Sequence, residues 1–256
     1  MKGIILGSVD WYDAPFRSRT SCVFFPEKKI VLDAGTGFAN IPDYLRDKDE
    51  LHILVSHGHN DHIYGLWPAH NILSDFKKVR VYGHEHIKKS IDNLFNECSS
   101  GYRFGDVKFD LETVVLDNND QFNINDVRVE TKRLGPHTLR VNCFKLFFGD
   151  KVLSYVLDLP ISRASKHGIL DFIGGSTTVI HNCFEHTTPK DYNLRLHVTY
   201  ADELGKYLRG RVKKVILIGM NPKLANEFYK FTNNVFVDLE RWQEVVCSYD
   251  GMKFDV

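Results

Sequence analysis

The sequence predicts a layered fold of the α/β or α+β class, in which strands alternate with a few helices. Many short segments rich in Val, Ile, Leu and Phe are bounded by Gly, Asp, Asn or Pro, a pattern typical of buried strands. Fewer segments have the length and spacing of helices. With 256 residues, 43% of them hydrophobic, the chain is long enough to bury a sizeable core.

The expected elements extend through most of the chain. The predicted strands are Gly3–Gly7, Cys22–Pro26, Lys29–Asp33, Leu51–Ser56, Val79–Tyr82, Val107–Val115, Val127–Leu134, Val141–Phe148, Val152–Leu157, Thr177–Ile180 and Lys214–Ile218. The predicted helices are Ala39–Leu45, His86–Cys98, Ala201–Leu208 and Lys223–Phe231. The polar segment Leu116–Asp126 is interpreted as a turn. Since strands on both sides of it supply candidate site residues, we expect residues 1–256 to form a single domain.

Composition excludes several classes of protein. Lys+Arg and Asp+Glu each total 33, and this balance argues against a chain that coats nucleic acid, although a local basic patch stays open. Five scattered cysteines without C-x-x-C spacing fit a reducing compartment. We see neither a signal peptide nor an apolar run of about 18 residues that could span a membrane. We therefore expect a cytoplasmic protein that does not contact membranes.

The segment after the strand at Leu51–Ser56 carries the strongest chemical signal. It reads His57-Gly58-His59-Asn60-Asp61-His62, which places three histidines and one aspartate within six residues. Imidazole and carboxylate groups are the ligands that Zn²⁺, Mn²⁺ and Fe²⁺ take in proteins. Four ligands this close together would crowd one ion, so the natural interpretation is two neighbouring ions.

Two further strand ends offer ligands for such a pair. His137 follows Gly135-Pro136, and Asp158 ends the apolar run at Val152–Leu157. Strand ends are where α/β folds gather functional groups. An aspartate that ends a buried strand is well suited to bridge two ions.

From these residues the chain resembles the metallo-β-lactamase superfamily, and the resemblance runs nearly end to end. Gly7-Ser8, with Arg19 and Ser21, is similar to the family's first loop, and Asp33-Ala34-Gly35 to its strand-end aspartate motif. His57-x-His59-x-Asp61-His62 is similar to its histidine signature, and His137 to its third histidine. Asp158 is similar to its bridging aspartate, and Tyr249–Met252 to its closing strand. The resemblance implies an αββα sandwich, two mixed sheets flanked by helices, with two metals between the sheets.

The same resemblance implies a role for each candidate residue. One metal would be held by His57, His59 and His137, and the other by Asp61 and His62, with Asp158 bridging them. Asp33 would orient a ligand histidine. Asp61 would also act in catalysis by orienting or deprotonating the attacking water.

Within the superfamily the chain is most similar to the tRNase Z and small cyclic phosphodiesterase branch. His197-Val198-Thr199 resembles that branch's H-x-T motif, whose histidine assists phosphodiester cleavage, so His197 is a catalytic candidate. Asp158 lies only 21 positions after His137. This interval is too short for the tRNA-gripping arm that tRNase Z proteins usually insert there, which favours a small phosphodiesterase. The phosphonate-pathway members carry a cysteine-rich zinc loop near the N-terminus, and this chain does not.

One family feature is missing from the chain. The family closes its second metal site with a histidine after a late strand, and here that place falls on Gly219 or Met220. The second site is therefore expected to be weak. Other groups that could replace the histidine are His181, Cys183 and His186.

The function that these observations favour is hydrolysis of small or cyclic phosphodiesters by metal-activated water. The alternatives are a tRNase Z-like endoribonuclease, a lactone or ester hydrolase, and a degenerate one-metal binding protein. The expected cofactors are two divalent ions, Zn²⁺ first and Mn²⁺ or Fe²⁺ as alternatives. The expected partners are a small phosphodiester or nucleotide, RNA under the nuclease alternative, and a second copy of the chain in a homodimer.

Overall fold

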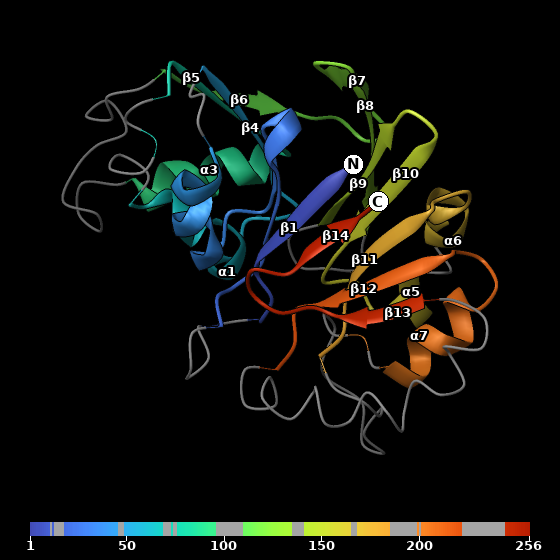
Figure 1. The fold of residues 1–256 in the computed structure, drawn as a ribbon. Coiled ribbons are helices and arrows are strands. Elements are labelled where there is room, and N and C mark those ends of the chain that lie inside the picture. Colours follow the sequence, from blue (N-terminus) through green and yellow to red (C-terminus); the bar gives the residue numbers. More distant parts are fainter. Residues whose placement is uncertain are drawn as a thin grey trace.

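Two mixed β-sheets pack face to face in the computed structural model, and helices cover the outer face of each sheet (Figure 1). The structure describes residues 1–10, 12, 18–45, 49–68, 73, 76–95, 110–134, 141–164, 168–184, 199, 201–221 and 244–256. The two chain ends lie side by side, since the backbone N–H of Val256 donates to the carbonyl of Met1 (3.0 Å). This αββα arrangement confirms the predicted fold class.

The first sheet has seven strands in the order β14-β1-β2-β3-β4-β5-β6. Pairing is antiparallel from β14 to β3 and parallel from β3 to β6. Parallel strands end at the same edge of a sheet, so the residues that follow β3 and β4 are brought together. The strands span Lys2–Gly7 (β1), Cys22–Phe25 (β2), Ile30–Leu32 (β3), Glu50–Leu54 (β4), Lys78–Gly83 (β5), Asp110–Val115 (β6) and Lys253–Asp255 (β14).

The second sheet also has seven strands, in the order β13-β12-β11-β10-β9-β8-β7. It is antiparallel from β7 to β10 and parallel from β10 to β13. The ends of β10, β11 and β12 therefore share one edge. The strands span Gln121–Ile124 (β7), Val127–Leu134 (β8), Val141–Phe148 (β9), Lys151–Val156 (β10), Thr178–Asn182 (β11), Lys214–Ile218 (β12) and Glu244–Cys247 (β13).

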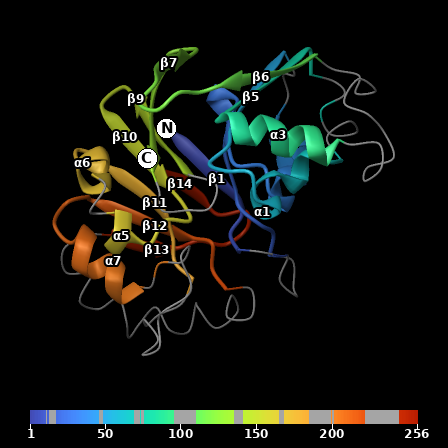
Figure 2. The same ribbon diagram turned by 180° about the vertical axis from the view of Figure 1, so that it is seen from behind.

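Short helices complete the two outer layers, α1 and α3 on one side and α5, α6 and α7 on the other (Figure 2). None of the helices in the described part of the chain is long and apolar enough to cross a bilayer. The helices span Pro26–Lys28 (η1), Thr36–Tyr44 (η2), Asn60–Ile63 (α1), Tyr64–Leu66 (η3), Glu85–Leu94 (α3), Ile161–Ala164 (α5), Ile169–Ile173 (α6) and Ala201–Leu208 (α7).

Three apolar clusters match the layers. The central cluster lies between the sheets and includes Phe25, Phe144 and Tyr155, all fully buried. Two outer clusters join each sheet to its helices, one around Phe38 and one around Leu208. Because side chains alternate along a strand, each sheet contributes to one outer cluster and to the central one.

Several sequence predictions need correction at the level of elements. The predicted closing strand Tyr249–Met252 is wrong, because these residues lie before β14 and the chain turns there through Gly251 (φ +87°). The polar segment Leu116–Asp126 is not only a turn, since it contains β7. The predicted helix Ala39–Leu45 is a 3₁₀ helix, η2, with a proline inside it. The predicted helix Lys223–Phe231 lies outside the described residues.

Candidate metal centre

The candidate site lies where strand ends of the two sheets meet. His57 and His59 follow β4 of the first sheet, and Asp158 follows β10 of the second. His59 keeps an extended backbone (φ −74°, ψ 152°) and serves as the N-cap of α1. The helix then turns Asp61 and His62 back toward the strand end. The local sequence thus provides the tight turn that the six-residue motif requires.

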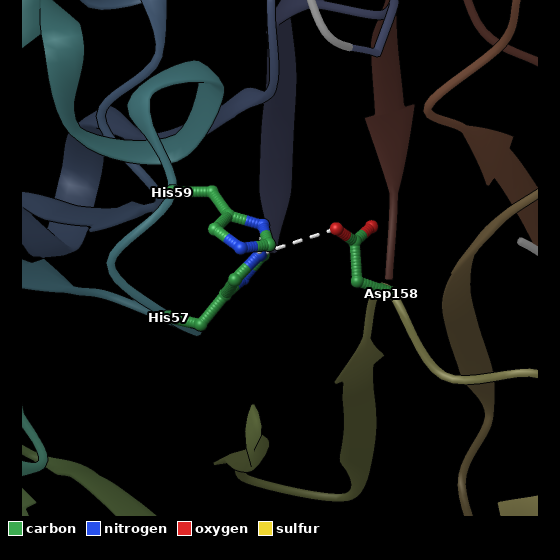
Figure 3. Close-up of side chains that lie close together, drawn as sticks. All are labelled: His57, His59 and Asp158. Carbon is green, nitrogen blue, oxygen red and sulfur yellow. Dashed lines mark hydrogen bonds and ion pairs between the residues drawn. The ribbon is translucent and has the colours of Figure 1, made fainter. Parts of the chain in front are cut away.

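A first cluster of possible ligand atoms is formed by His57, His59 and Asp158. Nε2 of His57 lies 2.9 Å from Nδ1 of His59 and 3.2 Å from Oδ2 of Asp158. The two imidazoles leave the same loop and face the carboxylate across the sheet boundary (Figure 3). Ser56 Oγ lies 3.1 Å from Nδ1 of His57 and steadies that ring.

A second cluster shares Asp158 with the first and adds Asp10, Asp61 and His62. The candidate ligand atoms of these four buried residues lie within 4.8 Å of one another. Nε2 of His62 is 3.4 Å from Oδ2 of Asp61 and 3.5 Å from Oδ2 of Asp158. Asp158 therefore occupies the position of a carboxylate between two ligand sets.

Asp33 holds the His62 ring from behind. Its Oδ2 lies 2.7 Å from Nδ1 of His62, and the whole carboxylate is buried. Ser56 donates to Asp33 through its backbone N–H (2.6 Å) and its hydroxyl (2.8 Å), and the Tyr155 hydroxyl donates as well (2.8 Å). A histidine that donates its Nδ1 proton to a carboxylate presents Nε2 for coordination. This contact is the one that the family resemblance implies for Asp33.

Charge is concentrated in this buried region. Burial raises the pKa of Asp10 well above its usual range, and the nearby Asp158 and Asp61 raise it further. Burial alone would lower the pKa of His62, but the carboxylates of Asp61, Asp33 and Asp158 raise it well above its ordinary value. Burial and the adjacent His57 lower the pKa of His59 to about 4. Four carboxylates in one buried region need cationic partners, since buried charge is stable only when it is compensated.

The residues present fit a divalent metal pair. Nε2 of the fully buried His62 has no hydrogen-bond partner within the part of the chain that the structure describes. A buried polar atom without a partner costs about 1–3 kcal/mol, so it indicates a missing ligand. Imidazoles and carboxylates are also the donor set that Zn²⁺, Mn²⁺ and Fe²⁺ accept.

Asp10 is the residue that sequence reasoning missed. It follows β1, and its backbone N–H donates to the carbonyl of Met220 (3.0 Å), directly after β12. The available signal was an aspartate just beyond an apolar strand, the same signal that marked Asp158. The sequence alone does not show that Asp10 lies in the site, because its contact with Met220 joins segments 210 positions apart.

Two candidates from the sequence, His137 and His197, lie outside the described residues, as does His186. The described Thr199 is fully buried, and its hydroxyl donates to the carbonyl of Leu159 (3.0 Å). His181 is buried with Nδ1 2.8 Å from the carbonyl of Asn182, and Cys183 is buried too. Neither His181 nor Cys183 belongs to the ligand clusters found among the described residues.

Comparison with known sequences gives a family match. Residues 16–144, just over half of the chain, match the model described as the metallo-beta-lactamase superfamily. A ribonuclease Z from Macrococcus caseolyticus (strain JCSC5402) is 33% identical over 84 residues, which are 30% of this chain and 25% of that protein. The matched region thus spans about a quarter of the length of this curated relative.

Comparison with solved structures agrees on the fold. The metallo-beta-lactamase fold protein YhfI from Bacillus subtilis is 14% identical with a TM-score of 0.75, and 99% of each chain is covered. The short form of human tRNase Z is 17% identical with a TM-score of 0.74, covering 100% of this chain and 99% of that one. A diphosphatase from the PhnP family is 14% identical with a TM-score of 0.69, covering 100% and 97%. At these identities the likeness concerns the fold alone.

Proposed function

The chain belongs to the metallo-β-lactamase superfamily, and we propose that it is a metal-dependent hydrolase whose substrates are small or cyclic phosphodiesters. The observation that carries this proposal is the pair of ligand clusters that share Asp158. Sites for two neighbouring metals recur in phosphatases and nucleases, where both the attacking and the leaving oxygen develop charge. The names of the ribonuclease Z relative and of the structurally similar tRNase Z and diphosphatase support the same class of substrate.

Each protein group has a task in the proposed reaction. Bound divalent metals supply Lewis acidity and lower the pKa of water. Such metals would be held by His57, His59 and His137 at one site and by Asp61 and His62 at the other, with Asp158 as a ligand common to both. Asp61 would orient the attacking water with its carboxylate, whose Oδ2 lies 3.4 Å from Nε2 of His62. His197 donates a hydrogen bond to a phosphate oxygen or a proton to the leaving oxygen.

A cavity lies next to the metal motif, on residues that are not candidate ligands. The cavity has a volume of about 440 Å³ and is lined in part by Gly58 and Asn60, the neighbours of His59. Tyr64 and Trp67 also line it, with their rings stacked at a centroid distance of 6.0 Å. Its volume lies within the range of about 300–1,000 Å³ that is usual for small-molecule sites, but its lining contains none of the candidate metal ligands.

Purified protein loaded with Zn²⁺, Mn²⁺ or Fe²⁺ can be assayed against bis-p-nitrophenyl phosphate, cyclic nucleotides, a lactone and a precursor tRNA. We expect turnover of phosphodiesters that chelation abolishes and re-addition of metal restores. Turnover of the lactone alone would exclude a phosphodiesterase. Absence of turnover of every substrate by protein with two bound metals would exclude it as well. Binding of one metal without turnover would instead favour the one-metal binding protein.

The second candidate function is a tRNase Z-like endoribonuclease. The observation in its favour is the local match to ribonuclease Z, at 33% identity over 84 residues. Two observations argue against it. The interval of 21 positions between His137 and Asp158 is short for a tRNA-binding arm, and the formal charge of the chain is zero, whereas RNA binding relies on basic groups. Cleavage of precursor tRNA at a higher kcat/KM than cyclic nucleotides would promote this candidate.

The role of His197 is tested by His197→Ala. We expect kcat on bis-p-nitrophenyl phosphate to fall by about 10²–10⁴, the usual contribution of a general acid or base, with two metals retained. Thr199 supports this expectation, because its hydrogen bond to Leu159 ties the H-x-T motif to the neighbour of Asp158. Metal analysis of the same variant provides the control. Loss of a metal along with activity would reassign His197 as a ligand.

Other properties stay predictions. The free thiols of Cys22, Cys143, Cys183 and Cys247 support the cytoplasmic location that we propose, since such compartments keep thiols reduced. Zn²⁺ is the metal that we propose first, because the first cluster is rich in imidazole. A homodimer is tested by the mass of the purified protein in solution.

A further inference from the structure

We propose that Asp10 is a protein ligand of the second metal, in the role that the family resemblance gives to a histidine at Gly219 or Met220. The proposal concerns metal binding and stands whether or not the substrate is a phosphodiester. Its basis is the set of four ligand atoms from Asp10, Asp61, His62 and Asp158, which lie within 4.8 Å of one another. Two ligand atoms that bind one ion at bond lengths of about 2.1 Å can lie up to about 4.2 Å apart. Small side-chain rotations are therefore enough to bring these four atoms to bonding distance of one ion.

Carboxylates alone would not define a metal site, but a second observation points into this one. Nε2 of His62 is fully buried and has no hydrogen-bond partner among the described residues, yet it faces the oxygens of Asp61 and Asp158 at 3.4 and 3.5 Å. Asp33 holds the other ring nitrogen. Nε2 of His62 therefore lies among the candidate ligand oxygens of Asp10, Asp61 and Asp158 without a hydrogen bond to any described residue.

The backbone fixes Asp10 at this position. The carbonyl of Ser8 accepts hydrogen bonds from the N–H groups of Gly219 (2.9 Å) and Met220 (3.2 Å). The N–H of Asp10 in turn donates to Met220, and the N–H of Val9 donates to Arg19 (3.0 Å). The loop after β1 is thus joined to the end of β12, and only 2% of the surface of Asp10 is exposed. A ligand held this firmly binds without a large loss of conformational entropy.

The same region of the structure disfavours a histidine at the end of β12. Gly219 has a φ of +67°, a conformation that L-residues rarely adopt, and a Cβ there would lie 3.0 Å from the Cβ of Asn182. Met220 is buried in the outer apolar cluster with Leu217 and Val215. Asp10 reaches the site from the adjacent chain segment instead.

The two metal sites would then differ in chemistry. The first is built from imidazoles with one carboxylate, whereas the second has three carboxylates and one imidazole. Oxygen-rich sites suit harder ions such as Mn²⁺ and Mg²⁺ better than nitrogen-rich ones do. The second site is accordingly expected to discriminate less strongly for Zn²⁺ over Mn²⁺ than the first.

The test is Asp10→Asn in the full chain, with metal content measured by mass spectrometry and Mn²⁺ affinity by calorimetry. We expect the wild-type protein to bind two Mn²⁺ ions. The variant should keep one ion, and its affinity for the second should fall by more than about 10-fold. Replacing a residue that only hydrogen-bonds to a metal ligand already has an effect of this size. Electron paramagnetic resonance should show a coupled Mn²⁺ pair in wild type and an isolated ion in the variant.

Asp250→Asn is the matched control. Asp250 is a largely buried carboxylate that supports the same loop by accepting hydrogen bonds from Ser8 Oγ (2.7 Å) and Arg19 N (2.6 Å), without belonging to either ligand cluster. We expect this variant to keep both metals. Two metals with unchanged affinity in Asp10→Asn would overturn the proposal, and so would equal metal loss in both variants, because that result would assign the effect to the loop. Circular dichroism of both variants verifies that each is folded.

Discussion

Asp158→Asn is expected to remove both metals and to lower phosphodiester turnover by at least about 10³-fold. Asp158 is the residue that the two ligand clusters share, with Oδ2 3.2 Å from His57 and 3.5 Å from His62. A metal that polarises a phosphoryl oxygen contributes several kcal/mol, and each 1.36 kcal/mol is tenfold in rate. Since one carboxylate belongs to both clusters, replacing it should lower metal binding and turnover more than replacing any single histidine does.

Asparagine is the better replacement because of the backbone. Asp158 has a φ of +51°, in the left-handed region that asparagine tolerates and alanine does not. The variant therefore changes the charge and leaves the turn intact. Metal content after desalting and kcat/KM on bis-p-nitrophenyl phosphate are the two measurements.

Asp150→Asn is the control at the opposite end of β10. The Asp150 side chain is 87% exposed, in the turn that precedes the strand. This change should leave metal content and turnover unchanged. If Asp158→Asn keeps two metals at wild-type affinity, Asp158 is not the shared ligand and the two-metal site must be assembled differently.

The part of the site that sequence reasoning identifies is the part with local signals. The residues from His57 to His62 are consecutive, so their chemistry is visible without knowledge of the fold. Asp158 is recognisable because an apolar strand ends in front of it. The sandwich itself was implied by the resemblance to the metallo-β-lactamase superfamily, and β8, β9 and β12 match their predicted bounds.

What sequence reasoning misses depends on contacts between distant segments or on weak patterns. Asp10 joins the site only because the loop after β1 binds the end of β12. β13 has only four residues, one exposed and three partly buried, at the edge of its sheet, so the run is short for a strand prediction. β14 buries a single residue, Phe254, between two exposed ones, and the family resemblance placed the closing strand at Tyr249–Met252 instead. A residue pattern of period three to four also cannot distinguish the 3₁₀ helix η2 from an α-helix.

Asp33→Asn is expected to weaken the metal site by about 10- to 100-fold and to destabilise the fold as well. Asp33 does not belong to either ligand cluster but contacts the ligand candidate His62, and replacing residues that hydrogen-bond to metal ligands usually lowers metal affinity by this factor. Its two carboxylate oxygens accept from the Ser56 N–H, the Ser56 hydroxyl and the Tyr155 hydroxyl, and Oδ2 also contacts His62. All of these groups are buried.

An asparagine cannot satisfy these donors. It offers one acceptor oxygen and one NH₂ group, so whichever way it is oriented, a donor faces a donor. If the NH₂ group faces His62, the Nδ1 proton loses its acceptor and the ring is no longer held with Nε2 toward the metal. Each unsatisfied buried group costs about 1–3 kcal/mol. Asp33 has a φ of +57°, which asparagine tolerates, so the backbone adds little to this effect.

Tyr155→Phe separates the two consequences. It removes one donor to Asp33 and leaves the contact with His62 in place. We expect about 1 kcal/mol of destabilisation in urea unfolding and a metal affinity within a few-fold of wild type. Asp33→Asn should change both quantities. Equal losses of metal affinity in the two variants would mean that the effect arises from disrupting the hydrogen-bond network around Asp33 and not from the loss of its contact with His62.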